Sequence, residues 1–240
     1  MSRNQLIQIY NNTRNLSQNY EKPQKSIKIK YDNLQIQQTS TTSKSRIMIF
    51  NDDTLIIANK LYLSTKSNIL VLNMASEYKA GGGVENGAMA QEEELFRRSN
   101  YFESLTPNLY PIKEFEAVYT KDVCIFKDDN YNLITSFKCS FVAIPAIRKP
   151  YLKNYKYNSI DRDIMRKKID FIFKIAIYYN YKNIVLGALG CGAFGNPPEE
   201  VAELFNDVIQ KYHNNFDNIY FAIKSIRDIN YDTFLAKITI

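Results

Sequence analysis

Residues 73–100 read NMASEYKAGGGVENGAMAQEEELFRRSN, and the rest of the chain is organised around this stretch. Directly before it, the apolar run Ile69 to Leu72 has the length and the branched side chains of a strand buried on both faces. The three glycines at 81–83 let the backbone adopt positive φ and approach a ligand closely. The acidic run from Gln91 onward is typical of the first turn of a helix. The stretch therefore predicts a strand, a glycine loop and a charged helix start.

Two interpretations of the acidic run compete. In the structural interpretation, Glu93 pairs with Arg97 and Glu94 pairs with Arg98, because residues four apart lie on one helix face. In the functional interpretation, the spacing of GGG, seven residues and then QEE places adjacent carboxylates at the mouth of a glycine-lined cleft. Adjacent carboxylates in a partly dry cleft repel each other, which raises one pKa and keeps an acid protonated near neutrality.

A second glycine cluster lies in residues 183–196, which read NIVLGALGCGAFGN. A buried strand enters it, and Pro197 and Pro198 after Asn196 predict a helix start with an Asn cap. Glycine-rich backbone N–H groups beside the positive end of a helix suit a diphosphate. The spacing is neither the dinucleotide-binding G-x-G-x-x-G pattern nor a P-loop.

The remaining chain predicts alternating strands and helices, and hence parallel strands with ligand sites at their C-terminal edge. We expect a polar loop at Asn33 to Ser45, a helix cap at residues 51–54 and a hairpin-like insertion formed by Ala117 to Thr120 and Asp122 to Phe126. Further strands are expected at Ser26 to Tyr31, Arg46 to Phe50, Ser140 to Ala146 and Asn218 to Ile223, and further helices at residues 2–20, Asp161 to Tyr179 and Val201 to Tyr212.

Length and composition favour one compact unit. The 240 residues are 45% hydrophobic, and we expect an accessory helix and polar loop over 1–45 followed by a main domain over 46–240. Three cysteines without paired spacing support neither a disulfide framework nor a zinc site. No long apolar run and no signal peptide are evident, so we expect an intracellular protein of the cytoplasm or nucleus, with no membrane partner.

The net charge of +6 has two explanations. It would attract a polyanion over long range. An A+T-rich coding sequence, however, produces abundant Lys, Asn, Ile and Tyr without any selection for charge. The single histidine, His213, leaves little basis for a histidine triad or a His-rich metal site, so carboxylates are the natural catalytic candidates.

With its GGG-x7-QEE loop and the second glycine loop in this order, the chain resembles the microbial type of poly(ADP-ribose) glycohydrolase over about 150 residues. The resemblance implies an α/β, three-layer macrodomain-like fold with a central mixed, mostly parallel sheet and an N-terminal helical extension. It implies hydrolysis of ribose–ribose glycosidic bonds in poly(ADP-ribose), without cofactor or metal. It also implies that the segment Lys224 to Phe234 borders the adenine.

The resemblance also implies roles for individual residues. Glu93 is the general acid that then helps to activate water, Glu92 holds the ribose hydroxyls, and Gln91 orients the loop. Phe194 packs on the ribose. The full set of substrate-binding residues that it implies is Asn73, Ser76, Gly81, Gly82, Gly83, Gln91, Gly190, Cys191, Gly192, Ala193, Phe194, Gly195 and Asn196.

The expected partners are free poly(ADP-ribose) or ADP-ribosylated proteins, with ADP-ribose as the product and no sequence-specific nucleic acid. We expect a monomer. Three alternatives remain open: a mono-ADP-ribosyl hydrolase, a non-catalytic ADP-ribose-binding macrodomain, and an interaction protein on a degenerate macrodomain scaffold. The intact QEE argues against the second, and the presence of both glycine loops argues against the third.

Overall fold

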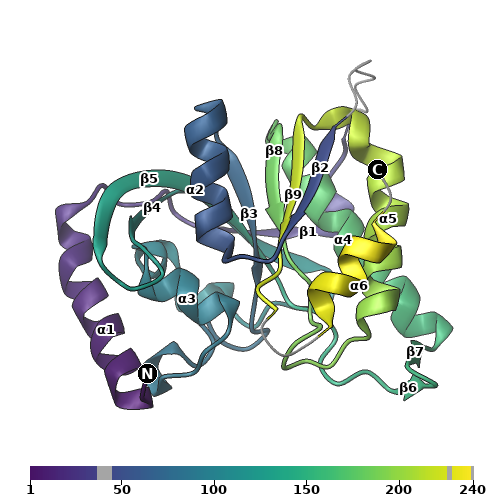
Figure 1. The fold of residues 1–240 in the computed structure, drawn as a ribbon, viewed down its shortest axis with the longest axis horizontal. Helices are drawn as coiled ribbons and strands as arrows, with labels where there is room; N and C mark the ends of the chain where they lie inside the picture. Colours follow the sequence, from purple (N-terminus) through teal and green to yellow (C-terminus); the bar gives the residue numbers. More distant parts are fainter. Residues whose placement is uncertain (37–44, 226–228, 239–240) are drawn as a thin grey trace.

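The computed structural model describes residues 1–36, 45–225 and 229–238. A central sheet has the strand order β1-β4-β5-β3-β8-β9-β2, in which β5, β3, β8, β9 and β2 run parallel and β1 and β4 are antiparallel to their neighbours (Figure 1). This is the mixed, mostly parallel sheet that was predicted. The strands are β1 (Ile27–Lys30), β2 (Arg46–Phe50), β3 (Ile69–Met74), β4 (Glu116–Lys127), β5 (Leu133–Ile144), β8 (Asn183–Leu186) and β9 (Asn218–Ala222).

Helices cover both faces of the sheet, which makes three layers (Figure 1). Along β3, Ile69 and Val71 pack with the helices of one face, whereas Leu70 and Leu72 pack with those of the other. Alternate side chains of one strand are therefore buried on opposite sides, which explains its continuous apolar sequence. One face carries α1 (Arg3–Leu16), α2 (Thr54–Thr65) and α3 (Gln91–Arg97), and the other carries α4 (Ser159–Tyr178), α5 (Pro198–Tyr212) and α6 (Asn230–Lys237).

The N-terminal segment is built into this structure. Strand β1 pairs with β4 of the central sheet, and the Thr13 hydroxyl of α1 donates to the backbone oxygen of Arg97 at 2.5 Å. The start of α1 also lies against the loop before α3. A Cβ on Gly87, whose φ is +69°, would come within 2.5 Å of the Arg3 oxygen. Helix α1 therefore packs directly on the segment that carries the QEE sequence.

One expectation about the strands needs correction. The residues expected to form a hairpin-like insertion, 117–126, belong to the single strand β4, whose register shifts at a bulge between Thr120 and Val123. Asp122 has φ +59° there, so the local break in the pattern marks a bulge and not a turn. Strands β2 and β3 are parallel but not adjacent, because β8 and β9 lie between them.

Two expected segments extend beyond the described residues. Most of the polar loop at Asn33 to Ser45, namely 37–44, lies outside them, and so does the part 226–228 of the expected adenine-bordering segment. The described remainder of that second segment includes the start of α6 at Asn230. A small separate hairpin, formed by β6 (Leu152–Lys153) and β7 (Lys156–Tyr157), precedes α4.

Candidate active site

A cleft of about 590 Å³ opens at the C-terminal edge of the sheet. Its walls come from the ends of five parallel strands, as expected for an open α/β sheet. The glycine loop after β8 lines it together with Gln91 and Glu94 of α3, whereas the side chains of Glu92 and Glu93 and the glycines at 81–83 lie behind this lining. The residues that line it include Asp52, Asp53, Met74, Ala75, Ala90, Gln91, Glu94, Ala146, Leu189, Gly190, Gly192, Ala193, Phe194, Ile223, Lys224 and Asn230.

Glu92 holds the first glycine loop together. One of its carboxylate oxygens accepts from the Ser76 N–H at 2.7 Å, and the other accepts from the Gly81 N–H at 3.2 Å and from the Asn73 amide at 3.3 Å. The side chain is only 3% exposed. Of the predicted substrate contacts, Asn73, Ser76 and Gly81 therefore meet at one buried carboxylate.

Glu93 lies beside this arrangement and differs from it in one respect. Its Oε1 accepts from the Gly83 N–H at 2.8 Å, which fixes the carboxylate against the loop. The residue is only 7% exposed. Its Oε2 is buried, yet it has no hydrogen-bond partner among the described residues. A buried carboxylate oxygen without a partner costs free energy, which is typical of a functional site. One oxygen of Glu93 is thus held by the loop, while the other has no partner among the described residues.

The glycines allow this close approach. Gly82 has φ +53°, and a Cβ there would lie 2.6 Å from Oε1 of Glu93. Gly81, with φ +72°, leaves no room for a Cβ next to the Phe96 ring. The backbone conformation and the space both require glycine at these two positions.

Gln91 anchors the start of α3 to the end of β3. Its side-chain oxygen accepts from the Met74 N–H at 3.0 Å, and its amide nitrogen donates to the Leu72 oxygen at 2.6 Å. These two hydrogen bonds fix the start of α3 against the end of β3. This geometry fits the expected orienting role of Gln91.

The raised pKa in the carboxylate pair belongs to Glu92. Burial raises the pKa of Glu92 to about 8, and the neighbouring Glu93 charge adds to this, while the Ser76, Asn73 and Gly81 donors oppose it. Burial is the larger cause, whereas the sequence argument relied on repulsion between the two acids. The raised pKa is therefore that of Glu92, the residue to which the resemblance assigns the ribose hydroxyls, and burial favours its protonated form.

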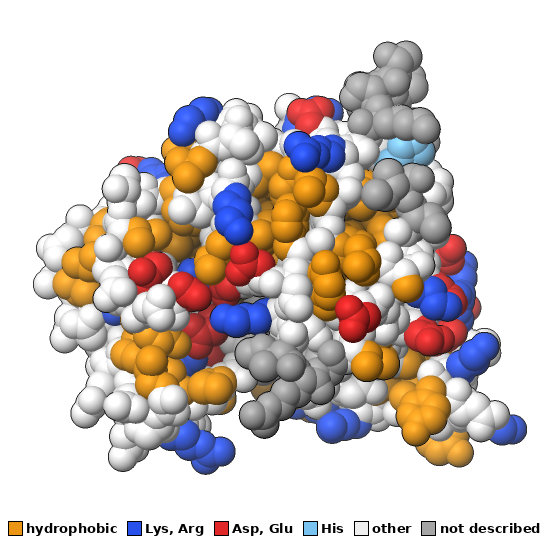
Figure 2. Space-filling model, in the orientation of Figure 1, with side chains coloured by type: hydrophobic (Ala, Val, Ile, Leu, Met, Phe, Trp, Pro, Cys, Tyr) orange, Lys and Arg blue, Asp and Glu red, His pale blue; other side chains and the backbone are white. Residues whose placement is uncertain are grey.

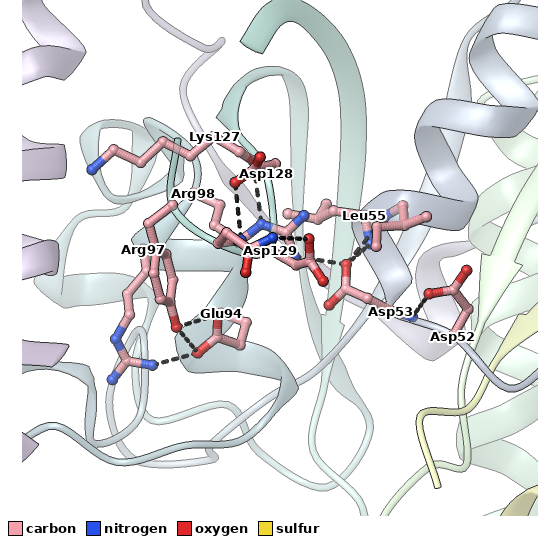
Figure 3. Close-up of polar contacts among 12 residues, drawn as sticks. Asp52, Asp53, Leu55, Glu94, Arg97, Arg98, Lys127, Asp128 and Asp129 are labelled. Carbon is pink, nitrogen blue, oxygen red and sulfur yellow. Dashed lines mark hydrogen bonds and ion pairs between the residues drawn. The ribbon is translucent and has the colours of Figure 1, made fainter. Parts of the chain in front are cut away.

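The expected pairs between residues four apart on α3 do not form. Glu93 faces the glycine loop, while Arg97 pairs with Glu94 at 2.8 Å and also donates to the Ala88 oxygen. Arg98 pairs with Asp53 at 2.6 Å, at the start of α2 (Figure 3). Both arginines are buried and must be paired. Arg97 takes its partner from the preceding turn of α3, and Arg98 takes a tertiary partner. Glu93 therefore has no cation partner within residues 1–36, 45–225 and 229–238.

The second glycine loop presents its N–H groups differently. Within the part of the chain that the structure describes, the backbone N–H groups of Gly192, Ala193 and Phe194 donate to no protein acceptor, and these residues line the cleft. A Cβ at Gly192 would meet no atom within 4 Å. Successive unpaired N–H groups ahead of a helix make an anion-binding concavity.

The Asn196 side chain stabilises this loop through three hydrogen bonds. It is 2% exposed, accepts from the Tyr157 hydroxyl at 2.7 Å, and donates to the oxygens of Ile147 at 2.7 Å and Gly190 at 3.1 Å. The prediction that Asn196 caps α5 is wrong, because Pro197 is the N-cap residue and has no capping side chain. The Asn196 side chain instead satisfies the tight turn that Gly190 makes with φ +76°.

Phe194 and Cys191 are both partly buried and pack against the hydrophobic core. The Arg148 guanidinium lies 4.1 Å from the centre of the Phe194 ring, and its Nε lies 3.3 Å from the Glu77 carboxylate. Gly195 has φ +73°, a turn conformation that favours glycine.

Sequence reasoning missed several residues of the cleft. Asp52 and Asp53 line it, although the sequence showed them only as a helix cap, a role that Asp53 also fills by accepting from the Leu55 and Ile56 N–H groups (Figure 3). Tyr131 and Asp129 reach it from the turn after β4, with the Tyr131 hydroxyl 3.0 Å from Glu94. The position of Asp52 and Asp53 directly after a strand was the one available signal.

Metal-binding clusters and membrane-spanning helices are both absent from the described residues. No group of three or more His, Cys, Asp or Glu side chains in residues 1–36, 45–225 and 229–238 could hold a metal ion. Among the same residues, no helix is long and apolar enough to span a membrane.

Solved structures share this fold. A poly(ADP-ribose) glycohydrolase (PARG) from Thermomonospora curvata is 22% identical over 98% of this chain and 99% of its own, with a TM-score of 0.87. Its complex with the inhibitor ADP-HPD gives 21% identity over 97% and 99%, with a TM-score of 0.83. A PARG from Deinococcus radiodurans in complex with ADP-ribose gives 24% identity over 81% and 84%, with a TM-score of 0.72.

These structural similarities, at sequence identities of 21% to 24%, show the fold alone. None of the curated protein sequences compared with the chain matches it. A family model does: the microbial-type PARG catalytic domain matches residues 2–129, which is more than half of the 240 residues and includes both the glycine loop at 81–83 and the QEE sequence. The chain therefore belongs to the microbial-type PARG catalytic domain family.

Proposed function

We propose that this protein is a poly(ADP-ribose) glycohydrolase in which Glu93 is the general acid and base. The observation that carries the proposal is the Glu93 carboxylate, with Oε1 held by the Gly83 N–H at 2.8 Å and a buried Oε2 that has no partner among the described residues. Family membership supports the reaction class.

The chemistry is that of glycoside cleavage. As the bond between C1 of one ribose and the hydroxyl oxygen of the next breaks, positive charge develops on the sugar and the departing oxygen takes a proton. The Glu93 carboxyl supplies that proton and, as a carboxylate, receives one from the attacking water. Glu92 positions the loop and Glu93 through its bonds to Ser76 and Gly81.

The second glycine loop supplies the anion site for the substrate diphosphate. The N–H groups of Gly192, Ala193 and Phe194 are the candidate donors, and the dipole of α5 adds a favourable field. Phe194 packs beside the ribose. The substrates are free poly(ADP-ribose) or ADP-ribosylated proteins, and ADP-ribose is the product, released by a monomer that requires no metal.

Comparing two isosteric variants tests the assignment. Glu93→Gln keeps the shape and the acceptor for the Gly83 N–H but cannot transfer the proton, so turnover of labelled poly(ADP-ribose) should fall by at least roughly 100-fold. The matched control is Glu85→Gln in the same loop, where the carboxylate is more than half exposed and pairs with Lys79. It should retain parental turnover.

Two further measurements separate the alternatives. Calorimetry should give nearly unchanged ADP-ribose affinity for Glu93→Gln, and thermal unfolding should give a nearly unchanged Tm. Parental turnover in Glu93→Gln, or a loss that merely follows a lower Tm, contradicts the role of Glu93 and favours a non-catalytic reader. If the parent removes single ADP-ribosyl groups from protein but does not shorten the polymer, it is a mono-ADP-ribosyl hydrolase.

A further inference from the structure

A chain segment beside the second glycine loop combines positive charge with exposed tyrosines. Residues 147–158 read IRKPYLKNYKYN, with four cations, three tyrosines and no acid. The exposed cations and tyrosines of this segment make up what we call the basic strip: Arg148, Lys149, Tyr151, Lys153, Tyr155 and Lys156. Figure 2 shows hydrophobic side chains flanked by Lys and Arg at the lower right, where Figure 1 places the β6–β7 hairpin.

The tip of the hairpin carries its tyrosine at a conformational cost. Asn154 and Tyr155 form the two-residue turn between β6 and β7, with φ values of +53° and +59°. Glycine or asparagine suits such positions, whereas a bulky side chain is unfavourable there. Tyr155 is 88% exposed, so packing does not repay this cost. Unfavourable backbone at an unpacked aromatic residue suggests a binding function.

The basic strip is firmly attached to the glycine loop. The Lys149 N–H donates to the Phe194 oxygen at 2.8 Å, and the buried Tyr157 hydroxyl donates to Asn196 at 2.7 Å. Arg148 stacks on the Phe194 ring at 4.1 Å and lies 5.6 Å from the Tyr78 ring, on the loop before the first glycines. The strip therefore begins at the rim where the two glycine loops meet.

Charge distinguishes this side of the cleft from the opposite wall. Asp52, Asp53, Glu94 and Asp129 line the cleft on the side of α2 and α3, a region in which Figure 2 shows acidic side chains left of the centre. Among the described residues, Lys149, Lys153 and Lys156 have no carboxylate partner. On the opposite wall Asp52, Asp53 and Glu94 are already paired with Lys60, Arg98 and Arg97. A polyanion that leaves the cleft is therefore attracted to the strip.

We propose that the basic strip binds the ADP-ribose units that follow the one held in the cleft. Its lysines contact the diphosphates, and Tyr151 and Tyr155 stack on adenine bases, the combination by which proteins hold flexible nucleotide chains. This inference rests on the proposed function, since it requires a polymer of ADP-ribose as substrate. It gives the enzyme a preference for long chains over short ones.

A triple variant tests the strip. Lys153→Ser, Lys156→Ser and Tyr155→Ser together change only exposed side chains, so the Tm should stay near the parental value. The KM for long poly(ADP-ribose) should rise by roughly tenfold. The kcat and the calorimetric affinity for ADP-ribose should not change. Two lost phosphate contacts should also reduce the slope of log affinity against log salt by about 1.4.

The matched control removes the same groups elsewhere. Lys25→Ser, Lys30→Ser and Tyr178→Ser take away two positive charges and an exposed tyrosine at sites that do not line the cleft. The control should keep the parental KM for long polymer. A KM that rises equally in both triple variants shows that net charge alone acts, which overturns the strip.

The other outcomes are separable. If the parent binds ADP-ribose and the strip variant keeps the parental KM for long polymer, the strip proposal fails and the proposed function stands. If the parent binds single-stranded RNA as tightly as polymer, and the strip variant loses only RNA binding, the strip is a nucleic-acid surface and the proposal is wrong. If the parent binds neither ADP-ribose nor polymer, the proposed function fails and the strip proposal fails with it.

Discussion

The glycine loop at 81–83 and the glycine loop at 190–196 both follow a parallel strand, yet they differ in whether their backbone N–H groups have acceptors within the protein. In the first loop the N–H groups of Gly81 and Gly83 donate to Glu92 and Glu93 of the same chain. In the second, those of Gly192, Ala193 and Phe194 have no acceptor among the described residues. The first loop thus holds two carboxylates of the same chain, whereas the second leaves three donors without an acceptor among the described residues.

The largest expected effect comes from filling the first loop. In Gly82→Ala the new Cβ would lie 2.6 Å from Oε1 of Glu93, and the φ of +53° becomes unfavourable by about 1–2 kcal/mol. Glu93 must then move, so turnover should fall by roughly 100-fold, as for loss of the general acid itself. Assay of ADP-ribose release together with urea unfolding measures both effects. Parental turnover would mean that the loop does not set the position of Glu93.

A substitution in the second loop should weaken binding and leave folding alone. At Gly192 a Cβ meets no atom within 4 Å, so Gly192→Glu should unfold at nearly the parental Tm. Its carboxylate would face the diphosphate, and the ADP-ribose affinity should fall by at least about tenfold, or roughly 1.4 kcal/mol. Gly192→Ala is the matched control, with a much smaller loss. Calorimetry that gives equal affinities for Gly192→Glu and the parent would exclude this loop as the anion site.

A third prediction concerns pH, because the first loop buries Glu92. Below about pH 4.5 the carboxyl is protonated in both the folded and the unfolded chain; between about 4.5 and 8 only the unfolded chain releases the proton. The raised pKa therefore lowers the stability of the parent progressively over this window. Urea unfolding of the parent and of Glu92→Gln from pH 4.5 to 8.5 should show the parent losing stability relative to the variant. A pH-independent difference would contradict the raised pKa.

The smallest expected effect belongs to the anchor behind the second loop. Tyr157→Phe removes the hydroxyl that donates to Asn196 at 2.7 Å, and such a hydrogen bond contributes about 1 kcal/mol to folding. The ADP-ribose affinity should fall only a few-fold, because Asn196 keeps its bonds to Ile147 and Gly190. Thermal unfolding and calorimetry test this. A loss as large as that of Gly192→Glu would mean that Tyr157 itself contacts the ligand.

Local patterns predicted the elements well, and they failed where a partner came from far along the chain. The strand at 46–50, the Asp53 cap and the helix at 91–97 follow from hydrophobic runs, capping chemistry and acids in a first turn. The break at Asp122 was read as a turn because a bulge depends on the paired strand β5. The expected pairing of Arg98 with Glu94 failed because Asp53, 45 positions away, offered a buried partner.

The sequence by itself determined the two glycine loops, the strands that enter them and the helices that follow them, because positive φ, strand burial and helix starts are local properties of residues 69–98 and 183–198. The tertiary structure decided how the two carboxylates differ. Glu92 reaches Ser76 and Asn73 at the end of β3, whereas one oxygen of Glu93 stays without a partner among the described residues. Adjacent, chemically identical side chains can be distinguished only by the long-range contacts and the burial that folding imposes on each.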